Sequence, residues 1–151
     1  MSENPIQKRL ILARNGQDPR VIGRMRSGWL VLADTQPLAG YCILMADPDV
    51  ESLNVMGEEA RLHYLADTVR AGDALLRATG AARINYETWC NLSPSLHTHI
   101  VPRYAHEAPA LRVLPMCVAY DVASARPFDA GADAPLMNTL RNLLDITPAG
   151  V

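Results

Sequence analysis

The sequence predicts an α+β protein in which an antiparallel meander sheet is accompanied by one long helix and by short helices towards the two ends. Two observations predict this class. Short apolar runs separated by turn residues follow one another closely, and one long stretch repeats its apolar residues at a helical period. Strands that are neighbours in sequence usually pair with each other, which favours antiparallel strands over a parallel sheet.

The N-terminal third predicts a short helix and three strands. Asn4 followed by Pro5 is typical of a helix start, because asparagine caps free amides and proline fits the first turn. Apolar runs at 21–25 and 29–33, separated by a serine-glycine turn, predict a hairpin. A third strand is predicted at 41–46, after a turn that contains proline and glycine.

The middle of the chain changes to a helical pattern over about residues 58–78. Apolar side chains recur three and four positions apart, with charged residues between them. The apolar positions are Leu62, Leu65, Ala66, Val69 and Leu76. Gly80 is typical of the residue that ends a helix, since glycine adopts left-handed backbone angles without strain.

The C-terminal half predicts two more strands and then a weaker pattern. The strands are expected at 83–88 and 97–103, joined by a polar, turn-prone link. Residues 105–115 are expected to be irregular, and 116–120 are expected to form one further strand. Asp133 precedes an Ala-Pro pair and a leucine stripe, so a last helix is predicted to open there.

Size and composition fit one soluble globular domain. The 151 residues are 49% hydrophobic and 20% charged, which is enough apolar material for a core. The formal net charge of -2 excludes bulk attraction to nucleic acid or to an anionic membrane, so neither is expected as a partner. No apolar run approaches the ~18 residues of a membrane helix. Three cysteines without disulfide-type spacing, and an N-terminus without a secretory pattern, predict a cytoplasmic protein.

Two histidines stand at the start of the strand predicted at 97–103. His97 and His99 are two residues apart, so their imidazoles point to one face of a strand while Thr98 points to the other. Histidine can act as nucleophile, acid or base near neutral pH, so one imidazole could attack phosphorus while the other steadies a phosphate oxygen. The alternatives are two partly buried sheet histidines without a function, or a zinc site completed by Cys90.

The residues around these histidines resemble the signature of the histidine triad (HIT) superfamily, in which three histidines alternate with apolar residues, often before Pro-Arg. The run 91–103, Asn-Leu-Ser-Pro-Ser-Leu-His-Thr-His-Ile-Val-Pro-Arg, carries the likeness. The strand that ends at Asp34, the turn at 37–40 and the long helix follow in the family's order and spacing. The resemblance extends over about residues 21–104.

The resemblance implies one domain and an activity on nucleotides. Residues 1–151 would form a single HIT-like domain, with a core at about 21–104 and a C-terminal extension at about 105–151. HIT proteins are typically homodimers that hydrolyse or transfer nucleoside monophosphates, from dinucleoside polyphosphates or nucleoside phosphoramidates. The expected partners are therefore a purine nucleotide substrate and a second copy of the chain. No cofactor is expected to be required, although Mg²⁺ would accompany a polyphosphate substrate.

The resemblance also implies a role for individual residues. The middle histidine of the triad, here His97, is the nucleophile that becomes nucleotidylated, and the last one, here His99, donates to the α-phosphate. The acidic or amide residue that ends the first core strand contacts the ribose hydroxyls, and here it is Asp34. Asn85 and Asn91 match the polar side chains that contact the phosphates or the leaving group.

The chain departs from the signature at two positions. Ser95 stands in place of the first triad histidine, and Tyr41 in place of a histidine that often follows the turn glycine. In the family, the backbone carbonyl of the first triad position orients the nucleophile, so Ser95 can still serve His97 and is placed with the nucleotide-binding residues. The two lost imidazoles leave open a non-catalytic nucleotide-binding module. Arg103, at the end of the signature, is expected to be a solvated strand-end residue.

Overall fold

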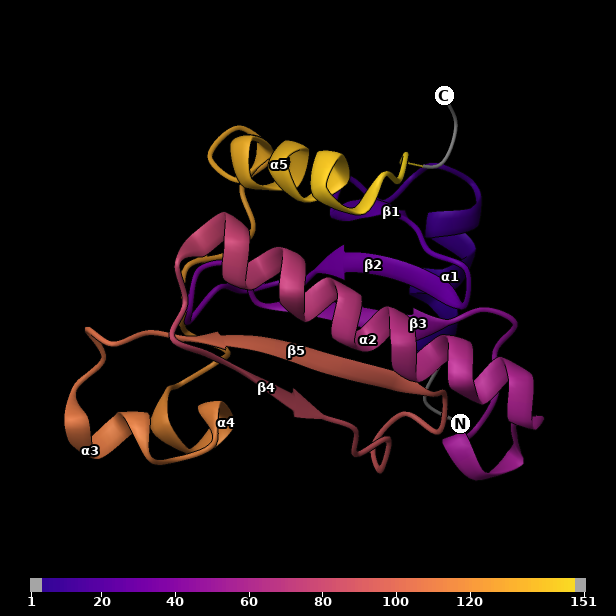
Figure 1. Ribbon diagram of the computed structural model, residues 1–151, viewed down its shortest axis with the longest axis horizontal. Coiled ribbons are helices and arrows are strands. Elements are labelled where there is room, and N and C mark those ends of the chain that lie inside the picture. The colour runs from indigo at the N-terminus through magenta and orange to yellow at the C-terminus, as the bar shows by residue number, and fades with distance from the viewer. Residues whose placement is uncertain (1–3, 149–151) are drawn as a thin grey trace.

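Within residues 4–148, which the computed structural model describes, the chain forms a five-stranded antiparallel sheet in the order β1-β2-β3-β5-β4 (Figure 1). The strands are β1 Val21–Arg24, β2 Gly28–Leu32, β3 Cys42–Ala46, β4 Arg83–Glu87 and β5 His97–Arg103. The first three strands form a meander. The long helix then crosses the sheet and places β4 at its edge, outside β5. The architecture is the α+β class that the sequence predicts.

The three helices that the sequence predicts begin close to the expected residues, and the described part of the chain contains three shorter helices besides. In chain order the helices are α1 Pro5–Arg14, the 3-10 helix η1 Leu53–Val55, α2 Glu58–Thr79, α3 Pro109–Arg112, α4 Met116–Ala119 and α5 Ala134–Leu144. The Asn4 side chain caps α1 by accepting a hydrogen bond from the Ile6 amide. Gly80 ends α2 with a left-handed φ of 69°. In the part of the chain that the structure describes, none of these helices has the length and apolar character needed to cross a membrane.

One predicted strand is wrong. Residues 116–120 contain α4, a single helical turn that begins after Pro115. Met116 is the one buried residue of this turn. Its side chain joins an apolar cluster with Ile43 and Val101 on the face of the sheet, so the turn packs across strands and does not extend their hydrogen bonding. The segment predicted to be irregular likewise contains the one-turn helix α3.

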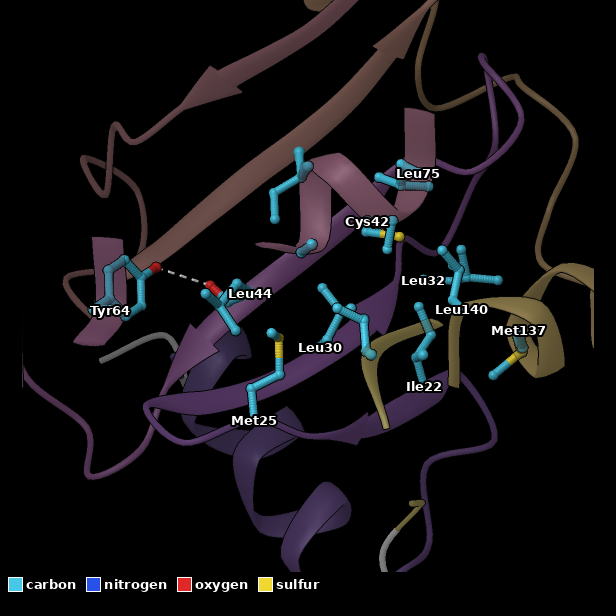
Figure 2. Close-up of a cluster of buried hydrophobic side chains, with 14 of the residues drawn as sticks. Ile22, Met25, Leu30, Leu32, Cys42, Leu44, Tyr64, Leu75, Met137 and Leu140 are labelled. Carbon is cyan, nitrogen blue, oxygen red and sulfur yellow. Dashed lines mark hydrogen bonds between the residues drawn. The ribbon is translucent and has the colours of Figure 1, made fainter. Parts of the chain in front are cut away.

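Both faces of the sheet are covered, and the central strands are therefore buried on both sides. On one face α2 and α5 pack over a cluster of large side chains (Figure 2). It includes Ile22, Leu30, Leu32, Leu44, Leu75 and Leu140. The Tyr64 hydroxyl donates to the Leu44 carbonyl oxygen at 3.0 Å and lies 2.9 Å from the Thr98 hydroxyl, which ties α2 to β3 and β5.

The opposite face carries a second apolar cluster that includes residues of α1. Its members include Leu10, Trp29, Val31, Ile43, Met45 and Val101. Thr98 faces α2, so the alternation of a strand turns His97 and His99 towards the α1 side. There they lie beside Met45 and Ile43, their partners in the register of β3 and β5. The sheet thus presents the two histidines at the beginning of β5, next to α1.

Candidate functional site

His97 and His99 lie close together on one face of β5, as their spacing predicts. Their rings meet edge-on with centroids 5.1 Å apart. Both line a pocket of about 420 Å³ whose walls come from α1, from Asp34 beyond β2, from β3 and from the loop before β5. The other lining residues are Pro5, Ile6, Arg9, Asp34, Ile43, Trp89, Cys90, Asn91, Leu92 and Ser93. The pocket therefore combines apolar walls with an imidazole pair and a few polar groups, as ligand sites commonly do.

The orientation of His97 is set by a backbone carbonyl. Its Nδ1 atom lies 2.7 Å from the carbonyl oxygen of Ser95. A carbonyl can only accept, so we assign the proton to Nδ1. The Nε2 atom then carries a free lone pair. This is the contact that the resemblance implies for Ser95, and it holds His97 in the form that a nucleophile requires.

The side chain of Ser95 has a structural contact and does not line the pocket. Ser95 is fully buried, and its hydroxyl accepts a hydrogen bond of 2.8 Å from the Asn4 side-chain amide. Asn4 is also the cap of α1. The serine therefore joins the start of α1 to the segment that enters β5, while its carbonyl holds His97.

Cys90 lies beside the same imidazole. Its Sγ atom is 3.6 Å from the His97 carbonyl oxygen and 3.7 Å from Nδ1 of the ring. Its backbone has a left-handed φ of 54°, which is uncommon for a residue with a side chain. The thiol thus sits in the wall of the pocket, on the side of the ring that faces Ser95.

His99 is held by a side chain instead of a carbonyl. The Tyr41 hydroxyl lies 2.6 Å from its Nδ1 atom. Burial first, and then the nearby His97, lowers the pKa of His99 to about 4, so the ring is neutral at neutral pH. Burial raises the pKa of Tyr41, so its hydroxyl keeps its proton. We therefore assign Tyr41 as the donor, which leaves the proton of His99 on Nε2.

Tyr41 changes the expectation for that position. The sequence suggests that the missing histidine removes a polar group from the surroundings of the site, but the tyrosine supplies a hydroxyl that contacts His99 directly. The two residues are 58 positions apart in sequence. Their contact follows from the antiparallel pairing of β3 with β5, which local sequence patterns do not specify.

Asp34 lies in the wall of the pocket and contacts two arginines. Its side chain is 61% exposed, and one carboxylate oxygen contacts the guanidinium groups of Arg9 and Arg20. Arg20 also pairs with the buried Asp18, with Nε and Oδ1 2.8 Å apart. Burial first, and then Arg20, lowers the pKa of Arg9. The sequence predicts Asp34 but not Arg9, since the position of Arg9 depends on how α1 packs against the sheet.

The two asparagines lie in different places. Asn91 is exposed and lines the histidine pocket, in the loop before β5. Asn85 lines a larger cavity of about 860 Å³ beside β4, to which neither His97 nor His99 contributes. Its side-chain oxygen accepts a hydrogen bond of 2.9 Å from Arg103. The structure therefore brings Asn91 to the histidines and commits Asn85 to Arg103.

Metal binding has little support in this geometry. Across residues 4–148, no three side chains of the His, Cys, Asp and Glu types are grouped so that they could hold a metal ion. Cys90 approaches His97 at Nδ1, the atom already 2.7 Å from a carbonyl oxygen, so the thiol and the imidazole do not converge on one point in the pocket. The arrangement suits a nucleophilic nitrogen beside a neutral hydrogen-bond donor.

Comparison with known proteins gives a likeness in fold. No family model matches this sequence, and no curated protein matches it. A solved histidine triad protein from Bradyrhizobium japonicum superposes with a TM-score of 0.68 at 22% identity, over 82% of this chain and 89% of that chain. A second, from Sinorhizobium meliloti, gives 0.69 at 18% identity, over 82% and 88% of the two chains.

A more distant structure extends the same likeness. A hypothetical histidine triad nucleotide-binding protein from Sulfolobus tokodaii superposes with a TM-score of 0.60 at 15% identity, over 83% of each chain. The five-stranded sheet with its long helix is thus the fold of solved histidine triad proteins. The HIT-like fold that the sequence predicts is confirmed.

Proposed function

We propose that this chain is a HIT-type nucleotidyl hydrolase or transferase that acts at the α-phosphate of a nucleoside phosphoramidate or a dinucleoside polyphosphate. One observation carries the proposal. The bond from His97 Nδ1 to the Ser95 carbonyl leaves Nε2 free beside His99. The fold adds support, because it is shared with proteins described as histidine triad proteins and, in one case, as nucleotide-binding.

The reaction would proceed in two displacements. In the first, the Nε2 lone pair of His97 forms a bond to the α-phosphorus, and the bond to the leaving group breaks with its electron pair on the departing atom. The ring becomes cationic, and its Nδ1 proton keeps its bond to the Ser95 carbonyl. In the second, water attacks phosphorus, the bond to Nε2 breaks, and a nucleoside monophosphate and a proton are released.

His99 would stabilise the charge that develops on the phosphoryl oxygens. With Tyr41 donating to Nδ1, the Nε2–H of His99 can donate to an oxygen of the α-phosphate. A neutral donor suits this task at pH 7, because a ring with a pKa of about 4 stays neutral. Tyr41 acts through His99 as a positioning residue.

The rest of the pocket would hold the nucleoside. Asp34 would accept hydrogen bonds from the ribose hydroxyls, with Arg9 and Arg20 fixing its carboxylate. Ile6 and Ile43 offer apolar walls for a purine base. The exposed amide of Asn91 would reach the phosphates.

The direct test is to trap the covalent intermediate. Protein mixed with an adenosine 5′-phosphoramidate and quenched in milliseconds should gain the mass of one adenylyl group on the peptide that contains His97. The His97→Ala variant should show neither the adduct nor turnover, while the matched control His63→Ala, on the far side of the sheet, should behave as the wild type. Robust turnover by His97→Ala would end this proposal.

The non-catalytic binding module remains the second candidate. It is favoured by the side chain at Ser95, which is committed to Asn4 and offers no imidazole behind His97. It predicts nucleotide binding by calorimetry with no covalent adduct under the same quench. Rapid hydrolysis across a panel of phosphoramidates and dinucleotides would exclude it.

A second copy of the chain is the proposed protein partner. The edge strand β4 has no strand on its outer side among the described residues (Figure 1). Beside it, α2 exposes an apolar stripe in which Leu62, Leu65 and Val69 are 59%, 44% and 51% exposed. Tyr86 of β4 packs against Gly72 of α2, so edge and stripe form one surface. Self-pairing of β4 would satisfy its free backbone groups and cover the stripe.

The mass in solution tests the dimer. Light scattering should give twice the chain mass for the wild type and one chain mass for Leu65→Glu. The control Val118→Glu changes an apolar residue that is 66% exposed on α4, away from the stripe, and should stay dimeric. A monomeric wild type would contradict the proposal.

A further inference from the structure

A second pocket adjoins the histidine pocket at His99. It holds about 270 Å³ and shares His99 and Trp89 with the histidine pocket, but not His97. Its remaining walls come from Tyr41, from Glu87 at the end of β4 and from Met116, Cys117 and Val122 of the C-terminal segment. We propose that this pocket receives the leaving group, and that Glu87 makes it selective for leaving groups that carry a positive charge. This inference rests on the nucleotidyl transfer proposed above.

The position of the pocket assigns it to the leaving group. Asp34, the proposed ribose contact, lines the first pocket together with His97, so the nucleoside would lie there. In a displacement at phosphorus, the leaving group departs opposite the attacking atom. The second pocket adjoins the first at His99 and contains neither Asp34 nor His97, so it is where a group expelled by His97 would go.

Glu87 gives this pocket a negative charge. It pairs with His99 in the register of β4 and β5, so the two side chains lie on the same face of the sheet as neighbours. Its charge adds to burial in raising the pKa of Tyr41, so the carboxylate lies within electrostatic reach of the group that holds His99. Between residues 4 and 148, the pocket has no lysine or arginine in its lining, and none pairs with Glu87.

The two pockets thus differ in charge. The nucleoside side has Arg9 and Arg20 around Asp34, whereas the leaving-group side has one carboxylate among apolar walls. An expelled polyphosphate would place several negative charges beside Glu87. An amine with an ammonium group would instead be attracted, while its carbon chain packs against Met116, Val122 and Trp89.

The bond changes balance for such a substrate. Nε2 of His97 forms the bond to phosphorus, and the P–N bond breaks with its electron pair on nitrogen. The departing nitrogen takes a proton from water and leaves as an amine, and the proton released in the second displacement restores the balance. Glu87 touches only the charged tail of the leaving group, so it determines specificity and takes no part in the proton transfer.

Charge-matched substrates test the assignment. Three adenosine 5′-phosphoramidates with the same linker, ending in an ammonium, a methyl or a carboxylate group, should be compared with a diadenosine polyphosphate. The wild type should prefer the ammonium over the carboxylate compound by about tenfold in kcat/KM. This is the expected scale because the ammonium gains one partly exposed ion pair with Glu87, whereas the carboxylate is repelled by it. Glu87→Gln should bring the two within about twofold, and Glu87→Lys should reverse the order.

The matched control is Glu51→Gln, an exposed carboxylate between β3 and η1, which should keep the wild-type preference. A charge preference that survives unchanged in Glu87→Gln, with turnover intact, would overturn this inference alone. An absence of turnover and adduct with all four substrates would overturn the proposed transfer itself, and this inference with it.

Discussion

The two ends of β5 carry charged or titratable side chains on the same face, but they use them in opposite ways. His97 and His99 at the beginning of the strand line an open pocket, and each is held through Nδ1. Arg103 at the end of the strand is only 4% exposed. Its guanidinium donates to Glu107, with the closest N–O distance 3.0 Å, and to Asn85. The histidines keep a free nitrogen for a ligand, whereas the arginine is satisfied by the protein.

The difference lies in what the chain does on each side of the strand. After β5 the chain folds back, and the Glu107 carboxylate accepts hydrogen bonds from the Tyr104 amide at 2.7 Å and the Tyr120 hydroxyl at 2.8 Å. Carbonyls of the α3 segment accept from Arg103 as well. Before β5 the chain gives His97 a single hydrogen-bond acceptor, the Ser95 carbonyl, and otherwise forms a loop that lines the pocket. A single strand can therefore hold a candidate site and a structural anchor four residues apart.

The largest expected effect comes from breaking the buried ion pair between Arg103 and Glu107. Arg103→Met should lower the free energy of unfolding by roughly 3–5 kcal/mol, because it leaves the buried Glu107 carboxylate without its partner. Denaturant unfolding measures the change. The double variant Arg103→Met/Glu107→Leu should recover much of the loss, since it removes the stranded charge. A loss below about 1 kcal/mol would mean that the ion pair behaves like an exposed one.

The second prediction concerns the pH dependence of stability at the other end. The pKa of His99 is about 4 in the folded chain, whereas an unfolded histidine titrates near 6.5, so the unfolded state binds more protons between these values. Stability is therefore complete above pH 6.5 and is lost as the pH falls towards 4. From pH 8 to pH 5 the contribution of His99 should amount to about 2 kcal/mol.

Comparison with His99→Gln isolates this contribution. Groups that do not interact with His99 contribute equally to the pH dependence of both proteins, so the wild type should lose about 2 kcal/mol more than the variant between pH 8 and pH 5. Denaturant unfolding at the two pH values provides the measurement. An equal loss in both proteins would show that His99 titrates normally and is not desolvated by the pocket.

Local patterns predict the histidine end of β5 better than the arginine end. The cap at Asn4, the stop at Gly80 and the common face of His97 and His99 all follow from residues near each other in sequence. The burial and hydrogen bonding of Arg103 do not follow from nearby residues, because they depend on a later segment folding back. That segment has weak local signals, which is why a strand is predicted where α4 forms, and why the sequence expectation of a solvated Arg103 is wrong.

The polar contacts of the site follow the same rule. The resemblance to the HIT signature implies the bond between His97 and the Ser95 carbonyl, and these residues are two positions apart. It does not reveal that Tyr41 holds His99 or that Arg9 reaches Asp34, since these contacts join elements that are distant in sequence. The second pocket has the same origin, because residues from β4 and the C-terminal segment meet only in the fold.

A smaller effect is expected from the hydroxyl that holds His99. Tyr41→Phe keeps the buried ring but removes the donor to Nδ1, so the Nε2–H form of His99 loses its stabilisation. We expect kcat to fall about tenfold with KM little changed, the scale of one lost hydrogen bond. Nitrogen chemical shifts of the His99 ring should show one tautomer in the wild type and a mixture in the variant. Unchanged nitrogen chemical shifts would show that Tyr41 does not position His99.

The smallest effect on activity is expected at Ser95, because the group that matters there is the backbone carbonyl. Ser95→Ala removes the hydroxyl that binds Asn4 and should lower the free energy of unfolding by about 1 kcal/mol, but it keeps the carbonyl that orients His97. Its kcat should therefore stay within about twofold of the wild type. Ser95→His, which introduces the histidine of the HIT signature, should destabilise the chain by about 1–3 kcal/mol without raising kcat, since the position is fully buried. The kcat of Ser95→His should be measured together with its unfolding curve. A large gain in kcat would show that the missing imidazole limits the reaction. The carbonyl alone would then not explain how this site orients its nucleophile.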